Sequence, residues 1–275
     1  MLLRWVDAFT DRPFAGNQAV VCLAKEPHRE RWMQSLASEV GVAGTAFVGP
    51  LGEGFSLRWF SPERELDLCG HATLAAAHVL WEDDWLDPAR PARFTTRSGQ
   101  LSARRVGEEI ELDLRARTAA PAQAPPAVLD ALGVRGAALR CAHEHEATLL
   151  LVLSGEEEVR TLAPSFDALR RAADLVVVTS RAETPGVDFV SRVFAPGAGI
   201  DEDSVTGSAH CLLGPYWASR LGRAELVGLQ VSPRGGRVRV KVGGNRVAMC
   251  GTAVTLWRGS LQPATLGVEL AAGVR

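Results

Sequence analysis

Two stretches of the chain repeat the same order of residue types, and this repeat constrains the fold more than any other feature. The first is RWFSPERELDLCGHA (58–72) and the second is RVFAPGAGIDEDSVTGSAH (192–210). Each begins with Arg-x-Phe, a small residue and Pro, and continues through an acidic stretch containing Glu65 or Glu202. Each ends in Gly-His-Ala or Gly-Ser-Ala before a helix-like run. Two copies are too few for a solenoid, so we expect two similar halves that face each other.

The segments around the repeat predict an α+β protein. Runs at 28–41, 70–84, 165–175 and 207–222 are typical of helices, and Gly41 takes the C-cap position of the first. Short apolar runs such as AVVCLA, LVVVTS and GRVRVKVGG predict strands. The regular spacing of the last strands favours antiparallel, half-exposed pairs over long parallel crossovers. In GRVRVKVGG the alternating basic residues predict the wet face of one strand, not a nucleic-acid patch.

A change of composition marks the expected domain boundary. In RARTAAPAQAPPAVLDALG (115–133), three prolines stand among alanines. Prolines cannot continue a sheet, and they stiffen an extended link. We read the acidic stretch Glu156 to Glu158, further along the chain, as a loop. We therefore expect two domains, 1–117 and 118–275, with the extreme C-terminus free to pack back on the first half.

Composition and charge exclude several classes of function. Of the 275 residues, 47% are hydrophobic and 23% charged, with a net charge of -2, so neither nucleic acid nor an anionic membrane is an expected partner. No apolar run approaches the roughly 18 residues of a membrane helix, and Arg4 and Asp7 come too early for a signal peptide. The five cysteines are odd in number and lack CxxC pairing, which fits a reducing compartment. We expect a soluble cytoplasmic protein.

One stretch, AHEHEATLL, raises the question of a metal site. His143 and His145 would share one face of a strand, with Glu144 and Glu146 beside them. A third ligand at suitable spacing is not evident. We therefore expect a solvated strand end and no metal.

The repeat places two helix starts after polar loops, an arrangement suited to anions. Glycine at each start, Gly70 and Gly207, lets the backbone approach a ligand closely, and the first helical turn offers unpaired N–H groups and partial positive charge. Facing one cleft, two such starts would hold an acidic small molecule, with His71, Asp203 and Ser208 placed to move protons or orient a carboxylate. The alternative is a pair of simple helix caps, but the duplication of the preceding proline and acidic residues favours a site.

The chain resembles the phenazine-biosynthesis PhzF-like isomerases, of the diaminopimelate-epimerase fold. The resemblance begins at VDAFTDRPFAGNQAVV, passes through FSPERELDLCGHATLAAA and ends with RVFAPGAGIDEDSVTGSAH and SPRGG, nearly the whole chain. It implies two pseudo-symmetric halves, each a curved mixed or antiparallel sheet around a central helix, with the active cleft between them. It also implies a small carboxylated substrate, no metal or organic cofactor, and homodimers.

Members of that family isomerise a cyclic amino-carboxylic acid by acid–base chemistry. By motif, His71 lies at the family's catalytic histidine, and Asp203 and Ser208 lie at its proton-handling and substrate-orienting positions. The positions implied for substrate binding are Asn17 in the cleft-lining loop and Gly70, Thr206 and Gly207 at the helix entrances. From the residues alone we add Arg234, in the flexible cationic loop RGG, as a partner for a substrate carboxylate.

The sequence departs from the family in AGTAF (43–47). The family has Ser-Glu-Thr-Ala-Phe there, and its glutamate removes the carbon-bound proton. Thr45, Ala46 and Phe47 keep the register, so Gly44 occupies the place of the glutamate and leaves it empty of any proton acceptor. Because a general base contributes roughly two to four orders of magnitude in rate, we expect the usual isomerisation to be much impaired. Restoring the base with Gly44→Glu should raise the activity if the cleft is otherwise intact.

Several groups are candidates to replace that base. Glu39 lies one and a half helical turns earlier, about 7.5 Å along a helix axis, and fits a helix surface. Cys69 matches one base of the two-thiol epimerases of this fold, but Thr206 matches the other and its hydroxyl is a poor base, so we expect Cys69 to be a small buried residue. Asp203 or His71 could serve another substrate. The protein is then either an isomerase with a different base or a binding protein that has lost it.

Overall fold

The computed structural model describes residues 1–26, 28–136, 139–145, 147–262 and 265, with only the backbone at 140–142 and 144–145. The chain forms two compact units. Unit 1 contains Met1–Pro13, Gln18–Leu112 and the chain from Thr252 onwards, and unit 2 contains Phe14–Asn17 and Asp113–Gly251. The chain therefore enters unit 2 a few residues before position 117, and it returns to unit 1 in its last strand.

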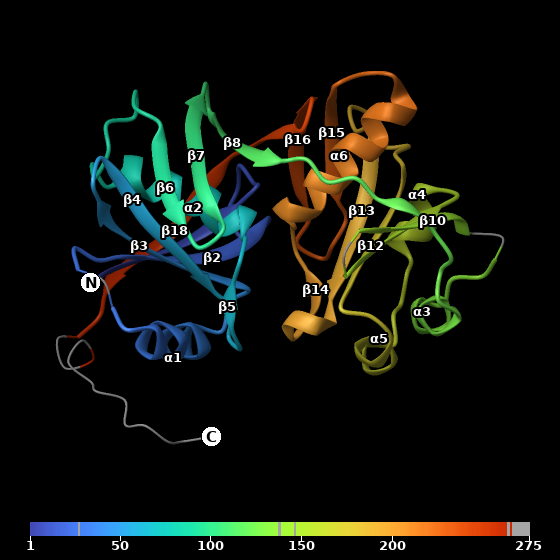
Figure 1. The fold of residues 1–275 in the computed structure, drawn as a ribbon, viewed down its shortest axis with the longest axis horizontal. Coiled ribbons are helices and arrows are strands. Elements are labelled where there is room, and N and C mark those ends of the chain that lie inside the picture. Colours follow the sequence, from blue (N-terminus) through green and yellow to red (C-terminus); the bar gives the residue numbers. More distant parts are fainter. Residues whose placement is uncertain (27, 137–138, 146, 263–264, 266–275) are drawn as a thin grey trace. The chain divides into compact units, whose positions relative to one another are not determined.

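Unit 1 is a mixed sheet packed around the helix α2 (Gly70–Glu82), as Figure 1 shows. This helix contacts β1, β3, β7 and β18, and 11 of its 13 residues are buried, because alanine and leucine on every side leave it no polar face. The second helix, α1 (Glu30–Val40), packs Met33 and Ala37 on the other face of β3 and β4. The strands are β1 (Leu2–Ala8), β2 (Asn17–Leu23), β3 (Gly44–Leu51), β4 (Gly54–Phe60), β5 (Glu65–Leu66), β6 (Ala92–Thr96), β7 (Gly99–Val106), β8 (Glu109–Arg115, which leads into unit 2) and β18 (Ala253–Ser260).

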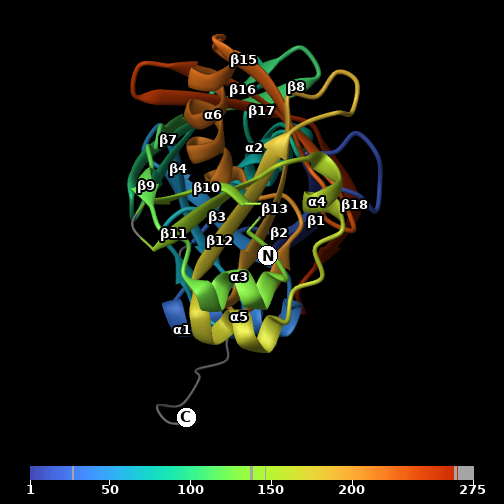
Figure 2. The same ribbon diagram turned by 90° about the vertical axis from the view of Figure 1, so that its right-hand side faces the viewer.

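Unit 2 repeats this plan around the helix α6 (Gly207–Leu221). This helix packs against β15, β16 and β17. On the other face of β11 to β13, the short helices α3 (Pro126–Leu132) and α5 (Phe166–Ala172) lie against each other, as Figure 2 shows. The remaining elements are β9 (Ala120–Ala122), β10 (Leu139–His145), β11 (Thr148–Leu153), α4 (Glu156–Arg160), β12 (Leu175–Arg181), β13 (Phe189–Ala195), the 3-10 turn η1 (Pro196–Ala198), β14 (Ile200–Asp203), β15 (Glu225–Gln230), β16 (Gly236–Gly243) and β17 (Arg246–Gly251).

The duplicated motif forms the same structure twice. In unit 1, Arg58 of β4 donates from Nε and Nη2 to the two carboxylate oxygens of Glu65, each at 2.7 Å. In unit 2, Arg192 of β13 holds Glu202 in the same way, at 2.7 and 2.8 Å. Both guanidinium groups also lie over a phenylalanine ring two residues further along their strand, at 5.3 and 5.1 Å. The two halves predicted from the repeat are therefore alike in detail.

Most elements agree with the sequence-based expectation. The four predicted helices are present, and Gly41 ends α1 in the left-handed conformation (φ 73°). The strands β15, β16 and β17 pair antiparallel, and in β16 the basic residues Arg237 and Lys241 are exposed while Val238 and Val240 are buried. Among the described residues, no helix has the length and apolar character needed to cross a membrane.

Two expectations were wrong. The stretch 115–133 is not a bare link, because it contains β9 and α3. Pro121 lies in β9 opposite His143, and Pro126 begins α3, where a missing N–H costs nothing because the first turn has no partner for it. The acidic stretch at Glu156 is the helix α4, not a loop.

The Glu156 carboxylate ties α4 to the following loop, and this gives a testable pH dependence. It accepts hydrogen bonds from the backbone N–H groups of Glu183 and Thr184, from the Thr184 hydroxyl and from Arg160, at 2.6 to 2.9 Å. Burial opposes its charge, but these bonds outweigh the burial and lower the pKa of Glu156 to about 2. Because the pKa is lower in the folded state, its stabilisation is complete above the unfolded value of about 4.3 and is lost as the pH falls towards 2.

We expect Glu156→Gln to lower the free energy of unfolding by about 2 to 3 kcal/mol at pH 7, since an amide NH2 would face two backbone donors. Urea unfolding at pH 7 and pH 3 should show a smaller loss at pH 3. Glu157→Gln is the control, because this neighbour is exposed on the same helix. An equal loss at both pH values would contradict the assignment.

Candidate functional site

In unit 1, the predicted residues Gly44, Gly70 and His71 meet where α2 begins. Gly44 is the first residue of β3, and Gly70 is the first residue of α2, preceded by Cys69 as the N-cap. The Cys69 sulfur lies 3.6 Å from Nδ1 and 3.7 Å from Nε2 of His71. Both side chains are buried. A thiol and an imidazole therefore lie in contact at the positive end of a buried helix.

The space directly beside Gly44 is occupied by these two side chains. A Cβ atom added to Gly44 would lie 2.6 Å from His71 Nε2, 3.0 Å from Cys69 Sγ and 3.1 Å from the Ala72 Cβ. Any other residue at position 44 would force the imidazole to move. The absent side chain lets α2 approach the β3 backbone, and the lack of a carboxylate at position 44 stays as the sequence predicted. The same contact argues against a gain of activity from Gly44→Glu alone.

In unit 2, Asp203 is the centre of a buried hydrogen-bond network. Its Oδ1 accepts from Asn17 Nδ2 at 2.6 Å, and its Oδ2 accepts from the Thr206 hydroxyl at 2.5 Å. Asn17 also donates to the Val205 carbonyl at 2.8 Å. Three residues predicted from the motif, Asn17, Asp203 and Thr206, are thus brought together. Two donors on one carboxylate fix its direction.

Gln230 belongs to this network, and the sequence analysis missed it. Its Nε2 donates to the Asp203 carbonyl at 2.6 Å, and its Oε1 accepts from the Thr206 N–H at 2.8 Å. Gln230 is fully buried at the end of β15. An amide side chain directly after the apolar run LVGL was the available signal, because a buried amide needs partners.

Arg234 holds the segment that carries Asn17. Its Nε donates to the Gly16 carbonyl at 2.9 Å and its Nη2 to the Ala15 carbonyl at 3.1 Å. The Gly16 N–H in turn donates to the Gly235 carbonyl at 2.8 Å. These bonds give Arg234 a role in placing Asn17; contact with a substrate carboxylate stays a prediction.

The first turn of α6 carries the remaining predicted residues, Gly207 and Ser208. Gly207 opens the helix, and Ser208 is half-buried. Within the part of the chain that the structure describes, no partner bonds the Ser208 hydroxyl, so it is available to a ligand. One turn later, His210 Nδ1 lies 2.9 Å from the Thr206 carbonyl. Burial lowers the pKa of His210 to about 4, so this histidine is neutral at pH 7.

Other candidates from the sequence lie elsewhere. Glu39 is exposed on α1, as expected for a surface residue. Glu65 is paired with Arg58, whose hydrogen bonds hold the pKa of that carboxyl below its usual value. No group of three or more His, Cys, Asp or Glu side chains suited to a metal is found among the described residues. The side chains of Glu144 and His145, and residue 146, lie outside the described part of the chain. The expectation that no metal binds beside His143 therefore stays a prediction.

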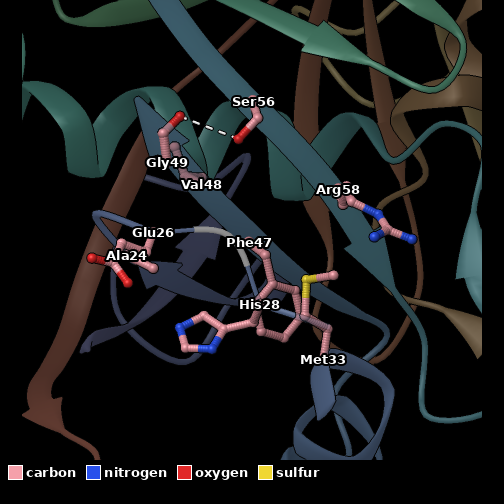
Figure 3. A pocket seen from close by; sticks show the side chains of 9 residues that line it. All are labelled: Ala24, Glu26, His28, Met33, Phe47, Val48, Gly49, Ser56 and Arg58. Atoms are coloured by element: carbon pink, nitrogen blue, oxygen red, sulfur yellow. Dashed lines mark hydrogen bonds between the residues drawn. The ribbon is translucent and has the colours of Figure 1, made fainter. Parts of the chain in front are cut away.

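A pocket of about 140 Å³ in unit 1 contains none of the predicted site residues. Figure 3 shows it on the face of β3 that carries Phe47, whereas Gly44 points to the opposite, α2 face. Its polar side chains are already engaged in part: Arg58 is paired with Glu65, and His28 stacks on Trp32 at 4.4 Å. The pocket is lined by Ala24, Glu26, His28, Met33, Phe47, Val48, Gly49, Ser56 and Arg58.

Comparison with known proteins supports the motifs. Residues 6–259 match the model of the PhzC-PhzF family, described as phenazine biosynthesis-like protein. A Halalkalibacterium halodurans protein named as an uncharacterized isomerase is 42% identical, over 93% of this chain and 96% of its own. The crystal structure of a PhzF-family protein from Enterococcus faecalis is 39% identical with a TM-score of 0.87, covering 94% of this chain and 97% of its own. A hydroxyproline epimerase from Agrobacterium vitis, solved with bound trans-4-hydroxy-L-proline, shares the fold at 12% identity and a TM-score of 0.61, covering 98% and 94%.

Proposed function

Because the chain belongs to the phenazine biosynthesis-like PhzF family, we propose that it is a cofactor-independent isomerase that moves a carbon-bound proton of a small carboxylated metabolite. In this proposal His71 and Asp203 handle protons, and Ser208 orients the substrate. The two α-helix starts, at Gly70 and Gly207, bind its carboxylate through their free N–H groups. Relatives named as isomerases support the reaction class.

The observation that carries this proposal is the buried Asp203 carboxylate with its two donors. Asn17 and Thr206 fix both oxygens, and Gln230 fixes the backbone on either side. A carboxylate that serves only the fold is more simply satisfied by an arginine, as Glu202 is one residue earlier. The partners of the Asp203 carboxyl are a hydroxyl and an amide and not a cation, which suits a group that accepts and returns a proton.

A second function is favoured by Gly44. If no group replaces the glutamate of the family, the protein binds the carboxylate and does not change it. A binding protein needs only Ser208 and the two helix starts to hold the carboxylate, whereas an isomerase needs a base as well.

Proton exchange in heavy water separates the two functions. L-proline, trans-4-hydroxy-L-proline and cyclohexene carboxylates are suitable probes, with binding measured by calorimetry and deuterium at carbon by NMR. We expect at least one probe that binds to gain deuterium. Binding of probes without any carbon-bound exchange would contradict the isomerase and support the binding protein. Sedimentation of the same sample tests the homodimer that belongs to this proposal.

A further inference from the structure

Proton removal needs a base, and the side chains that fill the space at Gly44 supply one. We propose that Cys69 and His71 form a thiolate–imidazolium pair, and that the Cys69 thiolate removes the carbon-bound proton in place of the missing glutamate. The assignment of the base rests on the proposed function, whereas the ion pair itself can be tested without it.

The contact between the two side chains suits an ion pair. The sulfur is nearly equidistant from the two ring nitrogens, at 3.6 and 3.7 Å, so the charge of an imidazolium, which both nitrogens share, would lie against the thiolate. A neighbouring imidazolium is one of the settings that convert a cysteine thiol to thiolate. The sulfur and the ring are thus placed to hold a thiolate beside its positive partner.

The position of Cys69 in the fold also favours a negative charge. As N-cap of α2 it stands beside the free N–H groups and the partial positive charge of the first turn. That turn contains no acidic residue, and the carboxylate of the same motif, Glu65, is paired with Arg58. The strand β1 packs against α2, and its buried charged residues are Asp7 and Arg4. Arg4 pairs with Asp83 at the C-terminal end of α2.

The placement of Cys69 and His71 depends on the glycine at position 44. The imidazole can lie against β3 only because position 44 has no Cβ. In unit 2 the residue matching Cys69 is Thr206, whose hydroxyl donates to Asp203. One half therefore holds a thiol beside an imidazole, and the other a hydroxyl beside a carboxylate. Such an asymmetry is expected of an isomerase that takes a proton with one group and returns it with another.

Cys22 and Cys211 lack these features. Burial raises the pKa of Cys22, and it raises that of Cys211 to about 11, so both remain thiols. The contact between a sulfur and imidazole nitrogens that is seen at Cys69 is not described for either of them. Cys211 is therefore a suitable control.

The step balances without an oxidant or a metal. The Cys69 thiolate takes the proton, an S–H bond forms, and the electron pair of the broken C–H bond is delocalised into the substrate carboxylate. The isomer forms when the carboxylic acid form of Asp203 adds its proton at a second carbon or at the other face of the first, a step that we assign to this residue. The Asp203 carboxylate then regains a proton from solvent, and the Cys69 thiol returns its proton to solvent.

The experiment measures the thiolate and the exchange separately. The difference in thiolate ultraviolet absorbance between wild type and Cys69→Ala reports the ionisation of Cys69 alone. The measurement does not require a reagent to reach the buried sulfur. We expect a thiolate signal at about pH 6, well below the ordinary thiol value of about 8.5, and its loss in His71→Gln and Gly44→Ala. Cys211→Ala and Gly243→Ala, where an added Cβ meets nothing within 4 Å, should retain it.

In the heavy-water assay, Cys69→Ala and Cys69→Ser should lower carbon-bound exchange by about two to four orders of magnitude, and Cys211→Ala should not. A protonated Cys69 at neutral pH, or exchange in both Cys69 variants within about twofold of wild type, would overturn the proposal. A normal thiolate signal in a protein that binds carboxylates but exchanges none would overturn the proposed function and leave the ion pair standing.

Discussion

Replacing Asp203 by asparagine is expected to lower isomer formation by about two to four orders of magnitude, while exchange at the carbon that loses its proton falls far less. Asparagine has nearly the shape of aspartate, and the Thr206 hydroxyl can turn to accept from the new NH2 group. The network with Asn17 and Gln230 therefore survives, but the group that returns the proton is gone. Deuterium retained in substrate and deuterium carried into the isomer are separate NMR signals, so both rates come from one sample.

The control for this prediction is Asp201→Asn. Asp201 lies in the same strand, is 44% exposed and pairs with Arg170, so its loss should change neither rate. Asp203→Asn with an unchanged melting temperature and unchanged isomer formation would remove Asp203 from the proton-handling residues. A higher KM at constant kcat would show that Asp203 orients the substrate instead.

Replacing Arg192 by methionine is expected to destabilise unit 2 by about 3 to 5 kcal/mol, because it leaves the Glu202 charge buried without a partner. The two side chains are only 9% and 11% exposed. Arg192 also donates to the Leu162 carbonyl at 2.7 Å, so a third bond is lost with the two to Glu202. Chemical unfolding followed by circular dichroism measures the change.

The duplication supplies a matched comparison. Arg58 makes the same two bonds to Glu65, but the Arg58 side chain is 33% exposed. Glu65, although only 8% exposed, also pairs with Arg97 at 3.5 Å, so water and Arg97 can replace part of the interaction. We expect Arg58→Met to cost about 1 kcal/mol. The double variant Arg192→Met, Glu202→Leu should recover much of the stability lost in the single variant, since it buries no unpaired charge. An equal loss at Arg58 and Arg192 would show that burial does not set the difference.

The sequence alone predicted much of the fold, and the duplicated motif shows why. Arg58 with Glu65, and Arg192 with Glu202, lie within ten residues of each other along the chain, so the motif contains its own partners. The starts of α2 and α6 were equally readable, because a glycine followed by alanine- and leucine-rich sequence is a local signal. The helix α3 was missed because three prolines outweighed the apolar spacing of Val128, Ala131 and Leu132, which the core of unit 2 buries.

For the candidate site too, local features were predicted from the sequence and long-range contacts were not. The residue types at His71, Asp203, Thr206 and Ser208, and the family that they indicate, follow from local order in the sequence. Contacts over long separations do not: Asn17 reaches Asp203 from 186 residues away, and Gln230 joins them from the end of another strand. Sequence showed only that Gly44 lacks a carboxylate. The packing of α2 on β3 decided what occupies that place, because a missing Cβ lets the helix bring Cys69 and His71 against the strand.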